Sequence, residues 1–146
     1  MNNVEYLKNK IKEEGDYKAF EYKGFKCRIL RTRVGRENSN LIYLWGYVGL
    51  PKSHKLYGHK GFIDNINTNY GVSGGFKELV YQPEKDLWWI GFDCGHIQDI
   101  CRLDEIDDIL NNRLTEFIFG IPTYKDMDFV TEELENLVDE LIKKED

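Results

Sequence analysis

The most constraining feature of this sequence is the stretch from Asp86 to Asp99, where an apolar, aromatic run passes directly into a polar cluster. The run Leu87–Phe92 is short and rich in aromatic residues, which is typical of a buried β-strand. The segment 93–99 follows at once and supplies two aspartates, a cysteine and a histidine. Side chains held at the end of a rigid strand are well positioned, as a binding or catalytic site requires. We therefore expect a functional site at the end of this strand.

Four further segments have strand patterns and predict an antiparallel sheet of about five strands. They are residues 17–23, 25–34, 41–50 and 76–82. The first two alternate apolar and polar residues on either side of Lys23 and Gly24, so we expect them to form a hairpin. The segment 51–75 has five glycines and no clear period, and an irregular loop of about 20 residues in a compact domain is usually functional or mobile.

Helical periodicity occurs near both ends of the chain. Apolar residues recur at helical spacing in 3–14, and Asp104 is a candidate N-cap for an acidic helix that extends to Asn112. The last helix has a broad apolar stripe formed by Val130, Leu134, Leu137, Val138, Leu141 and Ile142. The stripe is wide enough to face a second copy of the chain as well as the sheet, so the pattern is compatible with a homo-oligomer.

These elements predict a single α+β domain over residues 1–146, with the N- and C-terminal helices packed on the sheet. Within it we expect a helix in 1–15, a sheet-forming region in 17–99 and a helical region in 104–146.

Composition limits the partners and the compartment. The net charge of −6 argues against long nucleic acids, because phosphate neutralisation needs a basic surface. No apolar run approaches the ~20 residues that cross a bilayer, and the N-terminus lacks the features of a secretory signal. Three cysteines without CxxC spacing favour free thiols in a reducing compartment. We expect a soluble, cytoplasmic protein that binds neither membranes nor long nucleic acids.

A local basic strip contrasts with the acidic background. Six basic residues and no acid lie between Lys23 and Arg36. Arg28, Arg31 and Arg33 would suit bidentate contacts to a phosphate and stacking on a base. A solvated strand face is the commoner role for such a strip. If the strip binds a ligand, a small anion fits an acidic protein better than a long polyanion.

The spacing Asp93-x-x-His96-x-x-Asp99 places a histidine between two carboxylates. A carboxylate can orient an imidazole for acid–base work, and such groups can also bind a metal. The other interpretation is a polar cluster that caps the strand end. No spacing matches a strong zinc signature, even with His54 and His59 included. We therefore assign no catalytic residue, metal or cofactor.

Glycines and aromatic residues complete the candidate site. Gly74 and Gly75 would let backbone N–H groups approach a phosphate, although a plain tight turn explains them equally well. Consecutive tryptophans on a strand face opposite ways, so one of Trp88 and Trp89 is expected to face a cleft or a partner. The predicted ligand-binding residues are Arg28, Arg31, Arg33, Tyr47, His54, Tyr57, Gly74, Gly75, Trp89, Asp93, His96 and Asp99.

Over residues 41–142 the chain resembles a family of small phage and prophage proteins. The residues that carry the resemblance are Gly46-Tyr-Val-Gly-Leu-Pro51, His54-Lys-Leu-Tyr-Gly58, Gly74-Gly75, Leu87-Trp-Trp-Ile-Gly-Phe-Asp-Cys-Gly-His96 with Asp99, and the closing helix. The resemblance implies a phage origin and a shared site, and it implies no reaction. The family pattern has a histidine before the glycine pair where this chain has Ser73, which counts against a metal site.

Small phage proteins without an evident catalytic set often act on host defence. We expect a non-enzymatic protein in the host bacterial cytoplasm that sequesters a small anionic ligand, most simply a nucleotide immune signal. A metal- or histidine-dependent hydrolase of such a ligand is one alternative. An inhibitor that binds a host protein through its acidic face is the other.

Overall fold

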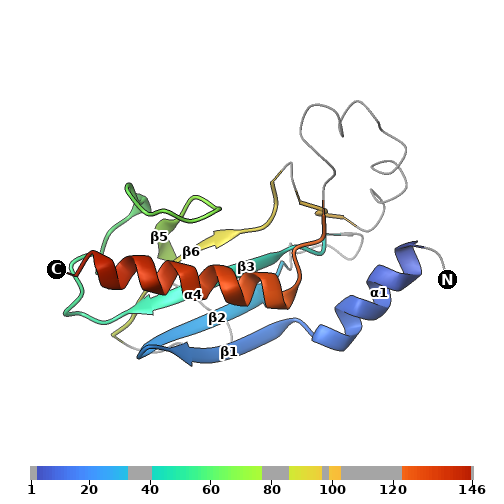
Figure 1. Ribbon diagram of the computed structural model, residues 1–146, viewed down its shortest axis with the longest axis horizontal. Helices are drawn as coiled ribbons and strands as arrows, with labels where there is room; N and C mark the ends of the chain where they lie inside the picture. The colour runs from blue at the N-terminus through green and yellow to red at the C-terminus, as the bar shows by residue number, and fades with distance from the viewer. Residues whose placement is uncertain (1–2, 33–40, 77–85, 97–98, 103–122, 146) are drawn as a thin grey trace.

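The computed structural model describes residues 3–32, 41–76, 86–96, 99–102 and 123–145. Six strands form one antiparallel sheet in the order β1-β2-β3-β6-β5-β4 (Figure 1). They are β1 (Tyr17–Tyr22), β2 (Phe25–Arg31), β3 (Leu44–Leu50), β4 (Gly61–Phe62), β5 (Ser73–Phe76) and β6 (Trp88–Asp93). Two helices accompany them, α1 (Asn3–Glu14) and α4 (Met127–Lys143). The α+β class and the antiparallel sheet are confirmed, with six strands in place of about five.

The hairpin of β1 and β2 is confirmed, with Tyr22 opposite Phe25. Lys23 and Gly24 both have positive φ, 49° and 85°, as a two-residue turn of type I′ requires. Gly24 adopts this conformation without strain, which explains why the chain reverses here.

Helix α4 lies across one face of the sheet and covers the main core (Figure 1). Its N-cap is Asp126, whose carboxylate accepts a hydrogen bond of 2.8 Å from the N–H of Phe129. The apolar stripe of the helix is buried as expected except for Ile142, which is partly buried, and Leu134 and Leu137 are fully enclosed. Gly46 on β3 permits this close packing, because a Cβ there would lie 3.1 Å from a methyl carbon of Leu134.

Helix α1 packs beside one end of the strands in Figure 1. Its C-terminal end contacts the start of α4, where the carboxylate of Glu14 accepts a hydrogen bond of 3.1 Å from the backbone N–H of Met127. Leu7 and Ile42 form a small buried cluster there, with Ile11, Ile100 and Tyr124 against it. None of the helices in the described residues is long and apolar enough to cross a membrane.

The glycine-rich segment 51–75 is less irregular than expected, because it contains β4 and most of β5. The strand that was expected from residue 76 onward is β5, which begins three residues earlier, at Ser73, and pairs with β6. Three expectations lie outside the described residues: the end of the strand expected over 25–34, the continuation of the later strand through 77–82, and the acidic helix in 104–112.

Candidate functional site

Apart from Arg31, the described residues that were predicted to bind a ligand lie in three separate regions of the molecule. Trp45 pairs with Asp93 at one end of β3, and Leu50 pairs with Trp88 at the other. Five residues of strand separate these pairs by roughly 17 Å. His54 follows the second end, so it lies far from Asp93. The residues gathered by sequence reasoning therefore do not form one site.

The first region follows the C-terminal end of β6, and Asp99 is the centre of a buried polar cluster there. Its carboxylate, which is 0% exposed, accepts hydrogen bonds from the Tyr70 hydroxyl at 2.6 Å and from the backbone N–H of His96 at 3.1 Å. The Lys125 ammonium lies 3.1 Å from the same carboxylate. Sequence reasoning missed Tyr70 and Lys125, because no local pattern links residues 26–29 positions away from Asp99.

Burial keeps the reactive groups of this cluster protonated. It raises the pKa of the Cys94 thiol to about 12, with the charge of Asp99 adding to the effect. Burial, followed by the hydrogen bond to Asp99, also raises the pKa of the Tyr70 hydroxyl. Neither group is a nucleophile at neutral pH, because the thiolate is the reactive form of cysteine.

The exposed part of the cluster is the pair of Asp93 and His96. The His96 side chain is 49% exposed, and its Nε2 lies 3.5 Å from a carboxylate oxygen of Asp93. Its ring also lies against the ring of Tyr70, with centroids 5.7 Å apart. Across the described segments, no three His, Cys, Asp or Glu side chains are grouped so that they could hold a metal ion. A histidine–carboxylate pair remains, which could donate hydrogen bonds or move a proton.

The second region lies on the face of the sheet away from α4, where Arg28, Tyr47 and Trp89 are all buried. The Arg28 guanidinium is 5.5 Å from the centre of the Trp89 ring. Tyr47 stacks on Trp45, with ring centroids 6.0 Å apart and planes within 6°. Burial raises the pKa of the Tyr47 hydroxyl, so it stays neutral. These side chains offer little surface to a ligand.

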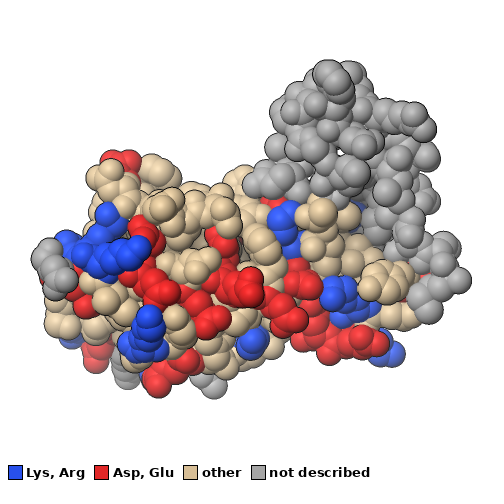
Figure 2. Space-filling view, viewed as in Figure 1, with Lys and Arg blue, Asp and Glu red and all other residues tan. Residues whose placement is uncertain are grey.

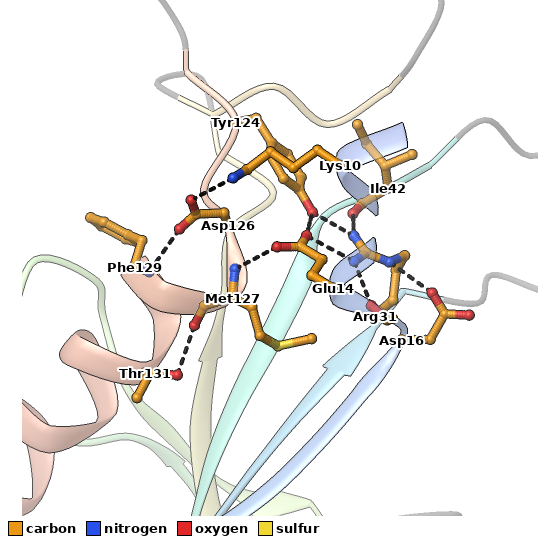
Figure 3. Close-up of polar contacts among 11 residues, drawn as sticks. Lys10, Glu14, Asp16, Arg31, Ile42, Tyr124, Asp126, Met127, Phe129 and Thr131 are labelled. Carbon is orange, nitrogen blue, oxygen red and sulfur yellow. Dashed lines mark hydrogen bonds and ion pairs between the residues drawn. The ribbon is translucent and has the colours of Figure 1, made fainter. Parts of the chain in front are cut away.

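Arg31 belongs to an intramolecular polar network that joins α1, β2 and the segment before α4 (Figure 3). Its guanidinium donates to Glu14 at 3.0 Å, to Asp16 at 2.9 Å and to the Tyr124 hydroxyl at 2.7 Å. It also donates to the carbonyl oxygen of Ile42 at 2.6 Å. These contacts engage the guanidinium, so we leave Arg31 out of the candidate site. Arg33 lies outside the described residues.

The third region contains His54, Tyr57, Gly74 and Gly75 near the start of β6. The rings of Tyr57 and Trp88 lie 6.0 Å apart, and both are half-buried. The Trp88 indole N–H donates to the carbonyl of His59 at 2.8 Å. His54 itself is buried, and its Nδ1 accepts a hydrogen bond from the N–H of Leu56.

The two glycines bring backbone close to this group of side chains. A Cβ at Gly74 would lie 2.3 Å from the carbonyl oxygen of His59, so only glycine fits there. Gly75 has a φ of +105°, and a Cβ there would lie 3.8 Å from the side chain of Lys60 and 3.9 Å from the ring of Trp88.

Three basic side chains that were not among the predicted ligand-binding residues complete this region: Lys55, His59 and Lys60. We call residues 52–60 the basic loop, because they contain three lysines and two histidines and no acid. Lys55 and Lys60 are exposed, whereas Lys52 pairs with Asp86 at 3.0 Å. A local count of charges over the loop would have found them.

Comparisons of this chain with protein-family models, with curated proteins and with solved structures found no match.

Proposed function

We propose that the protein is a non-enzymatic binding protein that sequesters a small anionic, nucleotide-like ligand at the basic loop. The observation that carries the proposal is the combination of Lys55 and Lys60 with the Tyr57–Trp88 ring pair and the glycine backbone at 74–75. Ammonium groups attract phosphate, and aromatic rings accept a base by stacking.

The charge distribution supports an anion site at this end of the molecule. In Figure 2, carboxylates dominate the middle of the face that α4 covers, whereas basic side chains gather near the C-terminal end of the helix. The basic loop adjoins that end, because Nε2 of His54 lies 3.8 Å from the carboxylate of Glu145. A positive end on an acidic protein gives a small anion one favoured place of approach.

The state of the buried thiols favours binding over covalent catalysis. Burial raises the pKa of Cys27 and Cys94 to about 12, so both are protonated at neutral pH. The resemblance to phage proteins extends the proposal: a phage-encoded protein in the bacterial cytoplasm would remove a nucleotide immune signal by holding it.

A histidine-dependent hydrolase is the second candidate, and the exposed Asp93–His96 pair favours it. The two functions differ in what happens to the ligand. A binding protein returns it unchanged, whereas a hydrolase returns a product.

Charge reversal in the basic loop tests the proposal. We expect the double variant Lys55→Glu, Lys60→Glu to lose at least tenfold in affinity for a cyclic mono- or dinucleotide, measured by calorimetry. Lys8→Glu is the control, because it makes the same kind of change at an exposed position on α1, far from the loop in Figure 1. Equal affinity of the double variant and the wild-type protein would remove the basic loop from the site.

A further inference from the structure

A polar cleft of about 300 Å³ lies between the C-terminal half of α4 and the loop that joins β4 to β5. Figure 1 shows this loop beside the helix. The residues that line the cleft are Asn67, Thr68, Asn69, Asn136, Asp139, Glu140 and Lys143. A cleft of this volume is at the lower end of the range for small-molecule sites.

Two carboxylates of α4 fix the loop that forms one wall of the cleft. Glu133, which is only 3% exposed, accepts hydrogen bonds from the backbone N–H of Asn69 at 2.8 Å and from its side-chain amide at 3.0 Å. Glu140 accepts from the backbone N–H of Asn67 at 2.9 Å. The wall is therefore held in place before any ligand binds, which lowers the entropic cost of binding.

The charged groups of the cleft already have partners. The Asp139 carboxylate pairs with the Lys23 ammonium at 2.8 Å, and this contact lowers the pKa of Asp139. Glu140 pairs with Lys143 at 3.1 Å. In the part of the chain that the structure describes, the side-chain carboxamides of Asn67 and Asn136 have no hydrogen-bond partner. Each offers an N–H donor and a carbonyl acceptor to a ligand.

We propose that this cleft binds the 2′-hydroxyl group of a ribose, and that it makes the protein prefer ribose to 2′-deoxyribose in its ligand. A hydroxyl donates and accepts at once, so it matches a carboxamide without adding charge to a cleft whose charges are balanced. The lining is predominantly polar, which disfavours an apolar ligand. The inference rests on the proposed function, which supplies a nucleotide as the source of the ribose.

The position of the cleft agrees with this assignment. Lys143 lines the cleft, and Glu145, two residues further along the chain, faces His54 of the basic loop. The sugar site and the anion site therefore lie at the same end of α4, as the sugar and phosphate of one ligand require.

Calorimetry with ribonucleoside 5′-monophosphates and their 2′-deoxy counterparts tests the inference. We expect the wild-type protein to bind the ribo form about tenfold more tightly, and Asn136→Ala to abolish this preference by weakening only the ribo form. The control is Asn9→Ala, which replaces an exposed asparagine by alanine on the other helix, so it should keep the preference. NMR titration with free D-ribose gives a second readout, because it should shift the amide signals of Asn67 and Asn69.

The outcomes separate the two proposals. Equal affinity for both sugars, with binding still dependent on Lys55 and Lys60, would overturn the sugar site and leave the anion site standing. Shifts from free D-ribose at Asn67 and Asn69, with no nucleotide affinity attributable to the lysines, would support the sugar site and contradict the anion site. No response to nucleotides or ribose would overturn both.

Discussion

Arg31 gives the sharpest test of how the molecule is held together. Its side chain is 7% exposed and donates to Glu14, to Asp16 and to the carbonyl oxygens of Gly15 and Ile42. Arg31→Met would keep most of the apolar volume and remove all of these hydrogen bonds. Glu14, whose side chain is 12% exposed, would then be a nearly buried carboxylate without its cation.

The expected loss of stability follows from this geometry. Removing one partner of a buried ion pair costs about 3–5 kcal/mol, since the remaining charge is left uncompensated. The contact with Asp16 adds little, because that carboxylate is 43% exposed and solvent screens it. We expect urea denaturation to show a loss of this size, with a fall in Tm of roughly 10 °C.

Two controls make the Arg31 experiment decisive. Lys8→Met removes an exposed cation and should change stability by no more than about 0.5 kcal/mol. Adding Glu14→Gln to Arg31→Met should restore part of the loss, because the two sites are coupled. If Arg31→Met costs less than about 1 kcal/mol and weakens nucleotide binding instead, the network is not structural and the arginine contacts the ligand.

Two further predictions follow from buried side chains. Leu137→Asp should unfold the protein, because the fully buried position would hold an unpaired charge; a folded species of unchanged size in light scattering would contradict this. Burial lowers the pKa of His54 from its ordinary value of 6.5. Between pH 6.5 and that lowered pKa, the histidine of the unfolded chain is protonated while the buried one is not, so the free energy of unfolding should fall as the pH drops through this range. His54→Gln should flatten the pH dependence in denaturation curves, and the control His59→Gln should leave it in place.

Local periodicity was sufficient to predict most of the sheet and the closing helix. The alternation in 17–31 and the turn at Lys23 and Gly24 specify the hairpin, because both the period and the turn chemistry are local. The same is true of the stripe on α4, in which Leu134 and Leu137 are fully buried. β4 and β5 were harder to predict, because Gly61, Gly74 and Gly75 have no side chains from which a period could be read.

The arrangement of the candidate site could not be predicted from local patterns. Whether two strand ends meet depends on strand direction and register, and these put His54 and Asp93 at opposite ends of the sheet. The basic strip was ambiguous for a similar reason: the more buried of the two carboxylates that pair with Arg31 belongs to Glu14, on a helix 17 positions earlier in the chain. The hydrogen bonds from Asn69 to Glu133 join residues 64 positions apart, so no local sequence pattern could predict them.

The central claim is that the protein holds its ligand without changing it. The most direct measurement incubates the purified protein with cyclic mono- and dinucleotides, removes the protein by filtration, and then heats it to release what it has bound. We expect one nucleotide to be depleted in proportion to the protein and recovered chemically intact after heating. Recovery of a hydrolysed product would make the Asp93–His96 pair the centre of an enzyme. No depletion of any nucleotide would contradict the account as a whole.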